Sequence, residues 1–123
     1  MNAALRIEEF RRAVSRLNEA LAEGEANPLS VDASIQRFEF SFELAWKSLS
    51  EVLMRDHGIR AASPKSALQQ AYQQQIINDE PIWLDMLRDR NLSTHTYREA
   101  LAREIHSRLP RYAEALGALA RRL

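Results

Sequence analysis

The chain has 123 residues, no cysteine, and 17 acidic against 17 basic residues. This length fits one domain, residues 1–123, with one hydrophobic core. The lack of cysteine excludes disulfides, zinc–thiolate sites and cysteine nucleophiles, and no apolar run approaches the roughly 18 residues that a membrane span needs. We therefore expect a soluble, cytoplasmic protein without a metal site or a cofactor.

The first half of the chain, up to Gly58, is predicted to form two helices. Apolar residues recur at intervals of three and four, which predicts helices with one buried stripe. The first helix is expected over about residues 3–23, before breakers at Gly24 and Pro28. The second should span about 27 residues and end at His57, with Gly58 as its C-terminal cap.

Apolar residues on more than one side distinguish the second helix. Phe40, Leu44 and Trp46 lie off its main stripe. A helix that is apolar on several sides must bury several sides. We therefore expect this helix to be central or also to face a partner chain.

Three more helices are expected in the second half. A short one begins at Ser63 and runs to about residue 74, with Tyr72 on its apolar side. Another begins at residues 79–81 and buries Trp83, Leu84 and Leu87. The last keeps its apolar stripe to the C-terminus and contains Pro110, which should bend it. The predicted fold is an all-α, antiparallel, up-and-down bundle of three long and two short helices.

Charge is distributed unevenly over this pattern. Residues 88–123 contain eight arginines and four acids, a formal charge of +4, which leaves −4 for residues 1–87. Fifteen of the 17 basic residues are arginine, whose planar guanidinium suits bidentate contact with phosphate or carboxylate. The basic segment fits a solvated helix face or a phosphate-facing surface, while overall neutrality argues against strong nonspecific binding to nucleic acid.

The segment from Asp89 to Tyr97 concentrates groups able to take part in chemistry. It holds Arg90, Asn91 and His95, in a protein with three histidines. In an unbroken helix, Arg90 and His95 would point about 140° apart, so they can converge only if the helix breaks. Residues 91–94 favour such a break, and Thr96 with Glu99 has the spacing of a capping box one step later, with Tyr97 at the start of the last helix.

Such a corner suits either packing or metal-independent cleavage of RNA. A helix N-terminus can hold a phosphate, Arg90 can stabilise charge on the phosphorane-like transition state, and His95 can transfer a proton near neutral pH. One histidine per chain is too few for both the acid and the base role. A symmetric dimer that brings two pairs of Arg90 and His95 together would supply both. The same residues also fit an ordinary capping corner.

A second candidate site surrounds the aromatic residues of the long second helix. The aromatic rings can stack a base or pack in a core or dimer interface, and the i, i+4 pair of Glu43 and Lys47 supports a helix. The residues that we regard as a possible nucleotide or substrate groove are Arg37, Glu39, Phe40, Glu43 and Trp46.

Two blocks, residues 36–47 (QRFEFSFELAWK) and residues 83–97 (WLDMLRDRNLSTHTY), resemble the nucleotidyltransferase substrate-binding protein family of the HEPN superfamily. The resemblance implies a small helical bundle that forms a homodimer and pairs with a separately encoded minimal nucleotidyltransferase. Several relatives are toxin-like, metal-independent ribonucleases with an Arg-x4-His motif, which Arg90, Asn91 and His95 match. In a subset, the partner transfers AMP to a tyrosine two residues after the histidine, the position of Tyr97.

Three hypotheses follow. The first is a toxin-like ribonuclease that acts across a homodimer, with RNA as its substrate, and is silenced by AMP on Tyr97. The second is a noncatalytic subunit that presents a nucleotide or another substrate to the transferase. The third is a helical module whose only role is to dock a partner. Walker motifs and paired transferase aspartates are absent, so the chain is not itself the transferase.

Overall fold

The computed structural model describes residues 3–123, and all regular secondary structure in this part of the chain is helical, without a strand. The α-helices are joined by short connections, and one 3-10 turn precedes the last helix. This confirms the predicted all-α bundle with three long and two short helices. The elements are α1 (Ala3–Ala22), α2 (Pro28–His57), α3 (Pro64–Gln73), α4 (Glu80–Leu92), η1 (Ser93–His95) and α5 (Glu99–Arg122).

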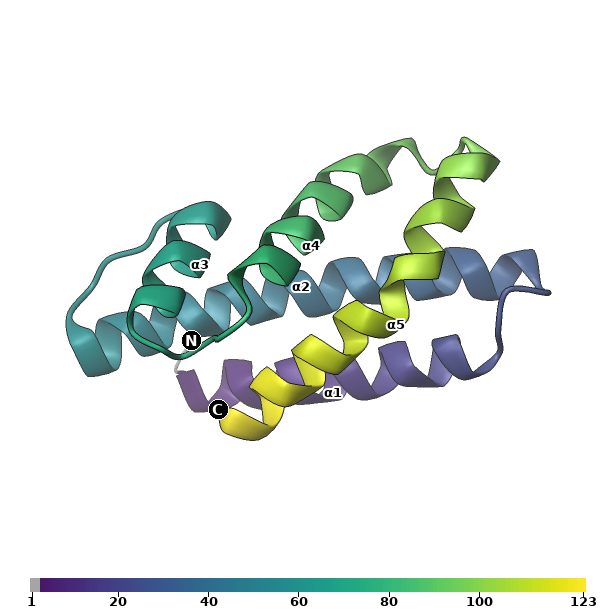
Figure 1. Ribbon diagram of the computed structural model, residues 1–123. Coiled ribbons are helices and arrows are strands. Elements are labelled where there is room, and N and C mark those ends of the chain that lie inside the picture. The colour runs from purple at the N-terminus through teal and green to yellow at the C-terminus, as the bar shows by residue number, and fades with distance from the viewer. Residues whose placement is uncertain (1–2) are drawn as a thin grey trace.

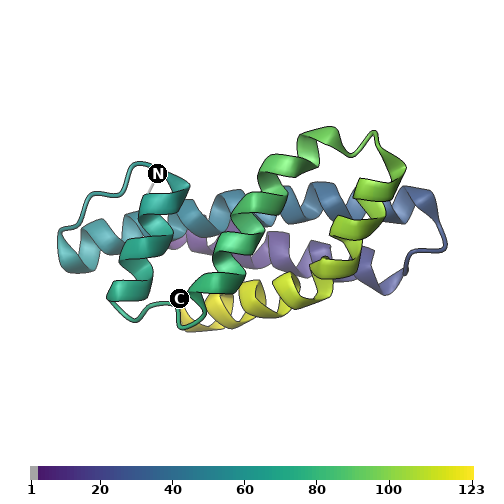
Figure 2. The ribbon, with the colours of Figure 1, turned by 45° about the horizontal axis from the view of Figure 1, so that its top comes forward.

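Helix α2 is the central element, as its several apolar sides predict. It runs antiparallel to α1 and contacts α3, α4 and α5 as well. Figures 1 and 2 show α3 and α4 along one side of α2, while α5 crosses back over α1 and α2 toward the start of α1. The groups on α2 can therefore meet groups from every other helix.

Capping residues set the ends of α2. The Asn27 side chain accepts a hydrogen bond from the Leu29 backbone N–H (2.9 Å), and Pro28 occupies the first turn. The helix is therefore 30 residues long, slightly longer than predicted, because the breakers Asn27 and Pro28 also start it. At the other end Gly58 adopts the left-handed conformation (φ +66°) and donates its N–H to the Met54 carbonyl (3.1 Å), as expected of a C-terminal cap.

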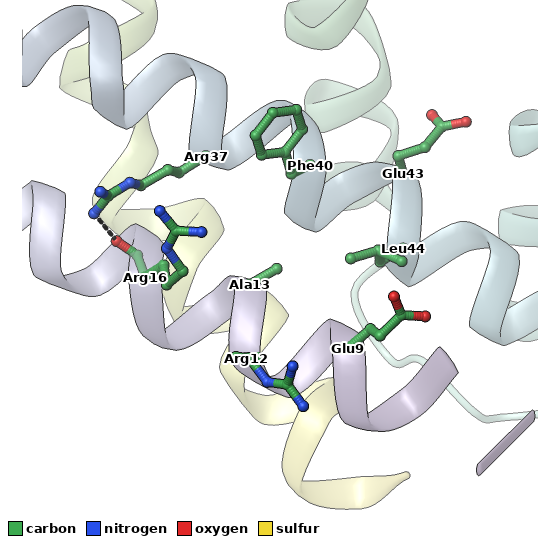
Figure 3. Close-up of a pocket in the computed structure, with 8 residues that line it drawn as sticks. All are labelled: Glu9, Arg12, Ala13, Arg16, Arg37, Phe40, Glu43 and Leu44. Carbon is green, nitrogen blue, oxygen red and sulfur yellow. Dashed lines mark hydrogen bonds between the residues drawn. The ribbon is translucent and has the colours of Figure 1, made fainter. Parts of the chain in front are cut away.

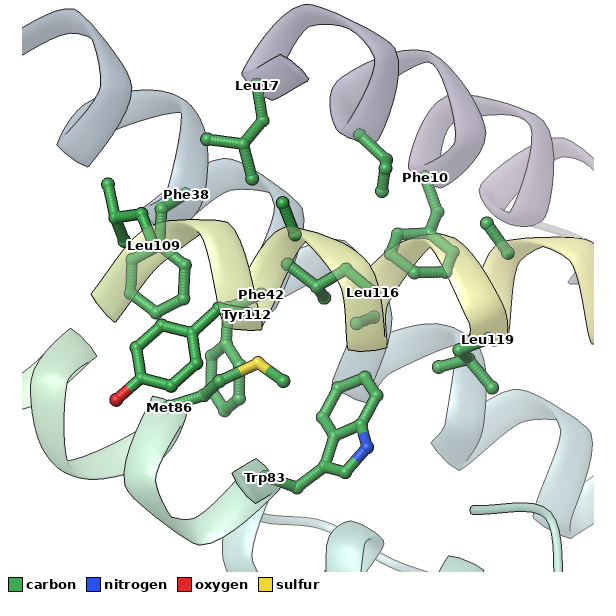
Figure 4. Close-up of a cluster of buried hydrophobic side chains, with 14 of the residues drawn as sticks. Phe10, Leu17, Phe38, Phe42, Trp83, Met86, Leu109, Tyr112, Leu116 and Leu119 are labelled. Carbon is green, nitrogen blue, oxygen red and sulfur yellow. The ribbon is translucent and has the colours of Figure 1, made fainter. Parts of the chain in front are cut away.

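All five α-helices contribute to the hydrophobic core. Tyr112 of α5 is fully buried and its ring stacks on that of Phe38, with centroids 5.4 Å apart (Figure 4). Trp83 is buried as predicted, but Leu84 and Leu87 are only partly buried. Met86, three residues after Trp83, takes the second inward position on the same face of α4 instead.

One prediction about the surface is wrong. Tyr72 does not lie on the buried side of α3, because its side chain is 45% exposed. The inward positions of α3 are held by Ala67, Leu68 and Ala71. A helix of only 10 residues needs just one narrow stripe to pack, and Tyr72 falls outside it.

Helix α5 continues through Pro110, and Figure 1 shows it bending along its length. Proline lacks a backbone N–H and its ring crowds the carbonyl four residues earlier, so a bend is the expected response.

Within residues 3–123, none of the helices combines the length and the apolar character that crossing a bilayer requires.

Candidate functional site

The corner between α4 and α5 is built later in the chain than predicted. Helix α4 continues through Leu92 and passes directly into η1, so the chain leaves helical geometry only at residues 96–98. The expected capping box is not formed: Thr96 Oγ1 donates to the Ser93 carbonyl (2.9 Å), and Arg98 is an N-cap without a side-chain cap bond. Tyr97 therefore precedes α5 and does not begin it.

Two carboxylates of α2 hold this corner against the central helix. Glu43 Oε2 accepts a hydrogen bond from Arg90 Nη2 at 3.1 Å. One turn earlier, Glu39 Oε2 lies 2.6 Å from the Ser93 hydroxyl, which is also 2.6 Å from the Arg90 carbonyl. Glu39 and Glu43 thus bind the two ends of one helical turn of the corner.

His95 and Tyr97 form a separate pair at the surface. The Tyr97 hydroxyl lies 3.4 Å from His95 Nδ1, and the two rings meet edge to face with centroids 5.9 Å apart. The Arg98 guanidinium lies 5.7 Å from the centre of the Tyr97 ring. Tyr97 is 75% exposed, so most of this residue faces solvent.

The predicted catalytic residues are near one another in sequence but belong to two sets of contacts. Arg90 is paired with Glu43 and lies 3.5 Å from the Asn91 amide oxygen, while His95 is paired with Tyr97. Across residues 3–123, no hydrogen bond or ion pair joins Arg90 to His95. Within one chain, the Arg90 guanidinium and the His95 imidazole therefore do not form a joint catalytic pair.

A buried ionic cluster adjoins the corner, and sequence reasoning missed it. Asp89 has a fully buried side chain, and its two oxygens receive Arg108 Nε (2.7 Å) and Nη2 (2.9 Å). The Tyr112 hydroxyl donates to the same carboxylate at 2.5 Å. Arg108 and Tyr112 are four residues apart on α5, a spacing that places both on one helix face and that could have indicated a shared partner.

This cluster changes the ionisation of its members. Burial alone would raise the pKa of Asp89, but the hydrogen bonds from Arg108 and Tyr112 and the positive charge of Arg108 hold that pKa below its ordinary value. Burial, together with the hydrogen bond to Asp89, raises the pKa of the Tyr112 hydroxyl. Asp89 therefore remains anionic and Tyr112 remains a hydrogen-bond donor, so the residue next to Arg90 is fixed to α5.

A groove of ≈ 340 Å³ runs between α1 and α2 (Figure 3). Its wall includes Phe40, which is 53% exposed, and Arg37, which donates to the Arg16 carbonyl at 2.8 Å. The lining residues are Glu9, Arg12, Ala13, Arg16, Arg37, Phe40, Glu43 and Leu44. An exposed aromatic ring beside several guanidinium groups can bind a base and a phosphate.

The five residues of the predicted groove are divided between three environments. Arg37, Phe40 and Glu43 line the groove. Glu39 instead contacts Ser93 at the corner. Trp46 is partly buried and packs against the hydrophobic core, so its ring is not part of the groove.

Glu43 belongs to both the groove and the corner. Its Oε2 faces Arg90, and its Oε1 lies 3.4 Å from Lys47 Nζ. Partial burial by itself would raise the pKa of Glu43, but the nearby Trp46 indole, Arg90 and Lys47 hold it below its ordinary value. The carboxylate is thus charged over the physiological pH range.

Known proteins share both the sequence pattern and the fold of this chain. Residues 5–123 match the family model described as nucleotidyltransferase substrate binding protein like. A crystal structure of a Thermus thermophilus protein is 36% identical, with a TM-score of 0.87 over 92% of this chain and 97% of the other. A Haemophilus influenzae structure, presented as the fold of a substrate binding domain of a nucleotidyltransferase, is 20% identical, with a TM-score of 0.80 over 94% of this chain and 96% of the other, and shares the fold. No curated protein matches the sequence.

Proposed function

Because the chain belongs to the nucleotidyltransferase substrate-binding protein family, we propose that it is the substrate-binding partner of a separately encoded nucleotidyltransferase. In this role it holds a nucleotide, or another phosphate-bearing substrate, for the transferase. The observation that carries the proposal is the α1–α2 groove, where Phe40 is exposed beside three arginines.

The groove offers separate contacts for the parts of a nucleotide. The Phe40 ring presents a face on which a base can stack, a contact worth about 1–3 kcal/mol per base in proteins that bind single strands. Arg12, Arg16 and Arg37 supply guanidinium groups for the polar edge of the base and for ribose oxygens. Arg37 already donates one N–H to the Arg16 carbonyl, which holds its side chain across the groove (Figure 3).

Binding of AMP to the purified protein tests this proposal. In an NMR titration, the amide signals of groove residues should shift, and Phe40→Ala and Arg16→Gln should each weaken binding about tenfold, the equivalent of 1.4 kcal/mol. Matched controls are Tyr72→Ala, an exposed ring on α3, and Arg111→Gln, an exposed arginine on α5. Equal losses in the controls, or shifts confined to residues outside the groove, would contradict the proposal.

A second candidate function is metal-independent cleavage of RNA, regulated by transfer of AMP to Tyr97. The observation that favours it is the exposed Tyr97 hydroxyl at 3.4 Å from His95 Nδ1. An AMP group there would place a phosphate and a base directly over His95 and would block access to it. The hydroxyl is also open enough for a partner enzyme to reach.

Cleavage would need more than one chain of the protein. In the reaction the 2′-hydroxyl attacks the adjacent phosphorus and the 5′-oxygen leaves, which requires a base, an acid and a positive charge. Since Arg90 and His95 do not contact each other within a chain, a homodimer that joins the two corners would supply these groups. RNA cleavage in EDTA that His95→Ala abolishes would support this function, and cleavage that persists in a folded His95→Ala variant would exclude it.

A further inference from the structure

The Glu43 carboxylate lies between two cationic side chains from different helices. Arg90 of α4 reaches its Oε2 at 3.1 Å, and Lys47 of α2 reaches its Oε1 at 3.4 Å. The side chains of Glu43, Lys47 and Arg90 are 33%, 42% and 40% exposed. Two positive charges therefore lie close together at an accessible place on the surface, and the Glu43 carboxylate lies between them.

We propose that Arg90 and Lys47 form a phosphate-binding site that Glu43 occupies in the ligand-free protein. Glu43 is then an internal competitor, which an incoming phosphate displaces from Arg90. The inference rests on the proposed substrate-binding function and assigns the part of the ligand that this site receives. The ligand class is a phosphate monoester, such as the 5′-phosphate of a nucleotide.

The chemistry of the groups supports this assignment. Guanidinium and ammonium groups bind carboxylate and phosphate oxygens through the same charge-assisted hydrogen bonds. A phosphate monoester carries about −1.5 to −2 charge at neutral pH, more than a carboxylate, so it can outcompete Glu43 for the two cations. Asn91, whose amide oxygen lies 3.5 Å from Arg90 Nη1, stands beside the same site.

The position of the site also fits the groove. Glu43 lines the α1–α2 groove and comes three residues after Phe40, which places the two on neighbouring positions of one helix face. A nucleotide whose base stacks on Phe40 can therefore extend its phosphate toward Arg90 and Lys47. The Glu43 carboxylate is the group that connects Arg90 to the groove, because it contacts Arg90 and also lines the groove.

An ordinary ion pair explains less of this arrangement. A Glu43–Lys47 pair at i, i+4 spacing supports α2 without a third partner. The Arg90 contact comes from 47 residues away and leaves both cations more than a third exposed. By contrast Glu51, two turns along α2, pairs with Arg6 at 2.7 Å in a less exposed environment.

Glu43→Gln separates the two explanations. In NMR titrations with AMP and with inorganic phosphate, this variant should bind about threefold to tenfold more tightly than the original protein, because the competing charge is gone. Lys47→Gln should bind more weakly, and the double variant should lose most of the gain. Glu51→Gln, which removes an equal charge from the same helix, should leave both affinities within about twofold.

The outcomes distinguish this inference from the broader function. If AMP binds in the groove but Glu43→Gln and Lys47→Gln leave its affinity unchanged, the inference is wrong and the groove function stands. If Glu51→Gln strengthens binding as much as Glu43→Gln, the effect is one of net charge, which also overturns it. If neither AMP nor phosphate binds any folded variant, both proposals fail. Thermal unfolding of each variant establishes that it is folded.

Discussion

Asp89 and Arg108 are joined by two hydrogen bonds, 2.7 Å and 2.9 Å long, one to each carboxylate oxygen, and the carboxylate has no exposure to solvent. This pair fixes the end of α4 to the middle of α5. The next residue along α4 is Arg90, so the cluster also fixes where the corner begins. Tyr112 completes it with a third hydrogen bond.

Removal of the Tyr112 hydroxyl should weaken the fold without disrupting it. Tyr112→Phe keeps the ring stacked on Phe38 but takes one donor from the buried Asp89, so we expect a loss of about 1.5–3 kcal/mol, typical of a hydrogen bond to a charged group. Urea denaturation measures this change. Tyr72→Phe, at an exposed position, is the control and should change the free energy of unfolding by less than about 0.5 kcal/mol.

The same cluster should make the fold sensitive to acid. The pKa of Asp89 is lower in the folded chain than its ordinary value of 3.8, so its contribution is complete above that value and is lost as the pH falls through the lower folded value. Asp89→Asn should cost about 3–5 kcal/mol at pH 7, because it removes the buried anion that accepts two hydrogen bonds from Arg108. The difference between the two proteins should narrow below about pH 4. If the free energies of unfolding of the original protein and of Asp89→Asn fall in parallel from pH 7 to pH 3, Asp89 is not the cause of the acid sensitivity.

Two glycines should respond in opposite ways to alanine. Gly58 has φ +66°, a conformation that a side chain disfavours, so Gly58→Ala should destabilise the fold by about 1 kcal/mol. Gly117 lies within α5, and a Cβ there would meet only the flexible end of Arg121 at 3.4 Å. Gly117→Ala should stabilise the protein by about 0.5–1 kcal/mol. Thermal unfolding of the two variants should show shifts of opposite sign.

Tyr97 should matter to chemistry and little to stability. Its ring is 75% exposed and its contacts are at the surface, so Tyr97→Phe should change the free energy of unfolding by less than about 0.5 kcal/mol. If a partner transferase modifies this residue, coexpression should add the mass of one AMP to the original protein and none to the variant. Retention of the added mass in Tyr97→Phe would move the modification to another residue.

The helices were predictable because each carries its own pattern and its own end signals. The apolar spacing identified α1, α2 and α5, and Gly58 marked the end of α2. The start of α2 differed by a few residues because Pro28 reads as a breaker, whereas the Asn27 side chain turns it into a helix start. Local patterns describe long helices well because their stability depends on periodic burial.

The candidate site was only partly predictable, because its contacts join residues far apart in sequence. Arg90 and Tyr97 were identified as candidates, but nothing in the sequence indicated that Glu43 would face Arg90 or that Asp89 would face α5. Tyr112 fits the apolar spacing of α5, so the sequence pattern predicts a buried ring and does not indicate that its hydroxyl donates to Asp89. The corner was placed too early because residues 91–95 can also continue a helix, as they do here.

The backbone of the corner is held largely by its own residues. Ser93, Thr94 and Thr96 hydroxyls contact carbonyls three residues before them, and the Arg98 N–H donates to the His95 carbonyl. The side chains of His95 and Tyr97 take no part in this scaffold and face solvent. Both side chains can therefore be replaced while the bend is kept, so this corner can present different chemical groups on an unchanged backbone.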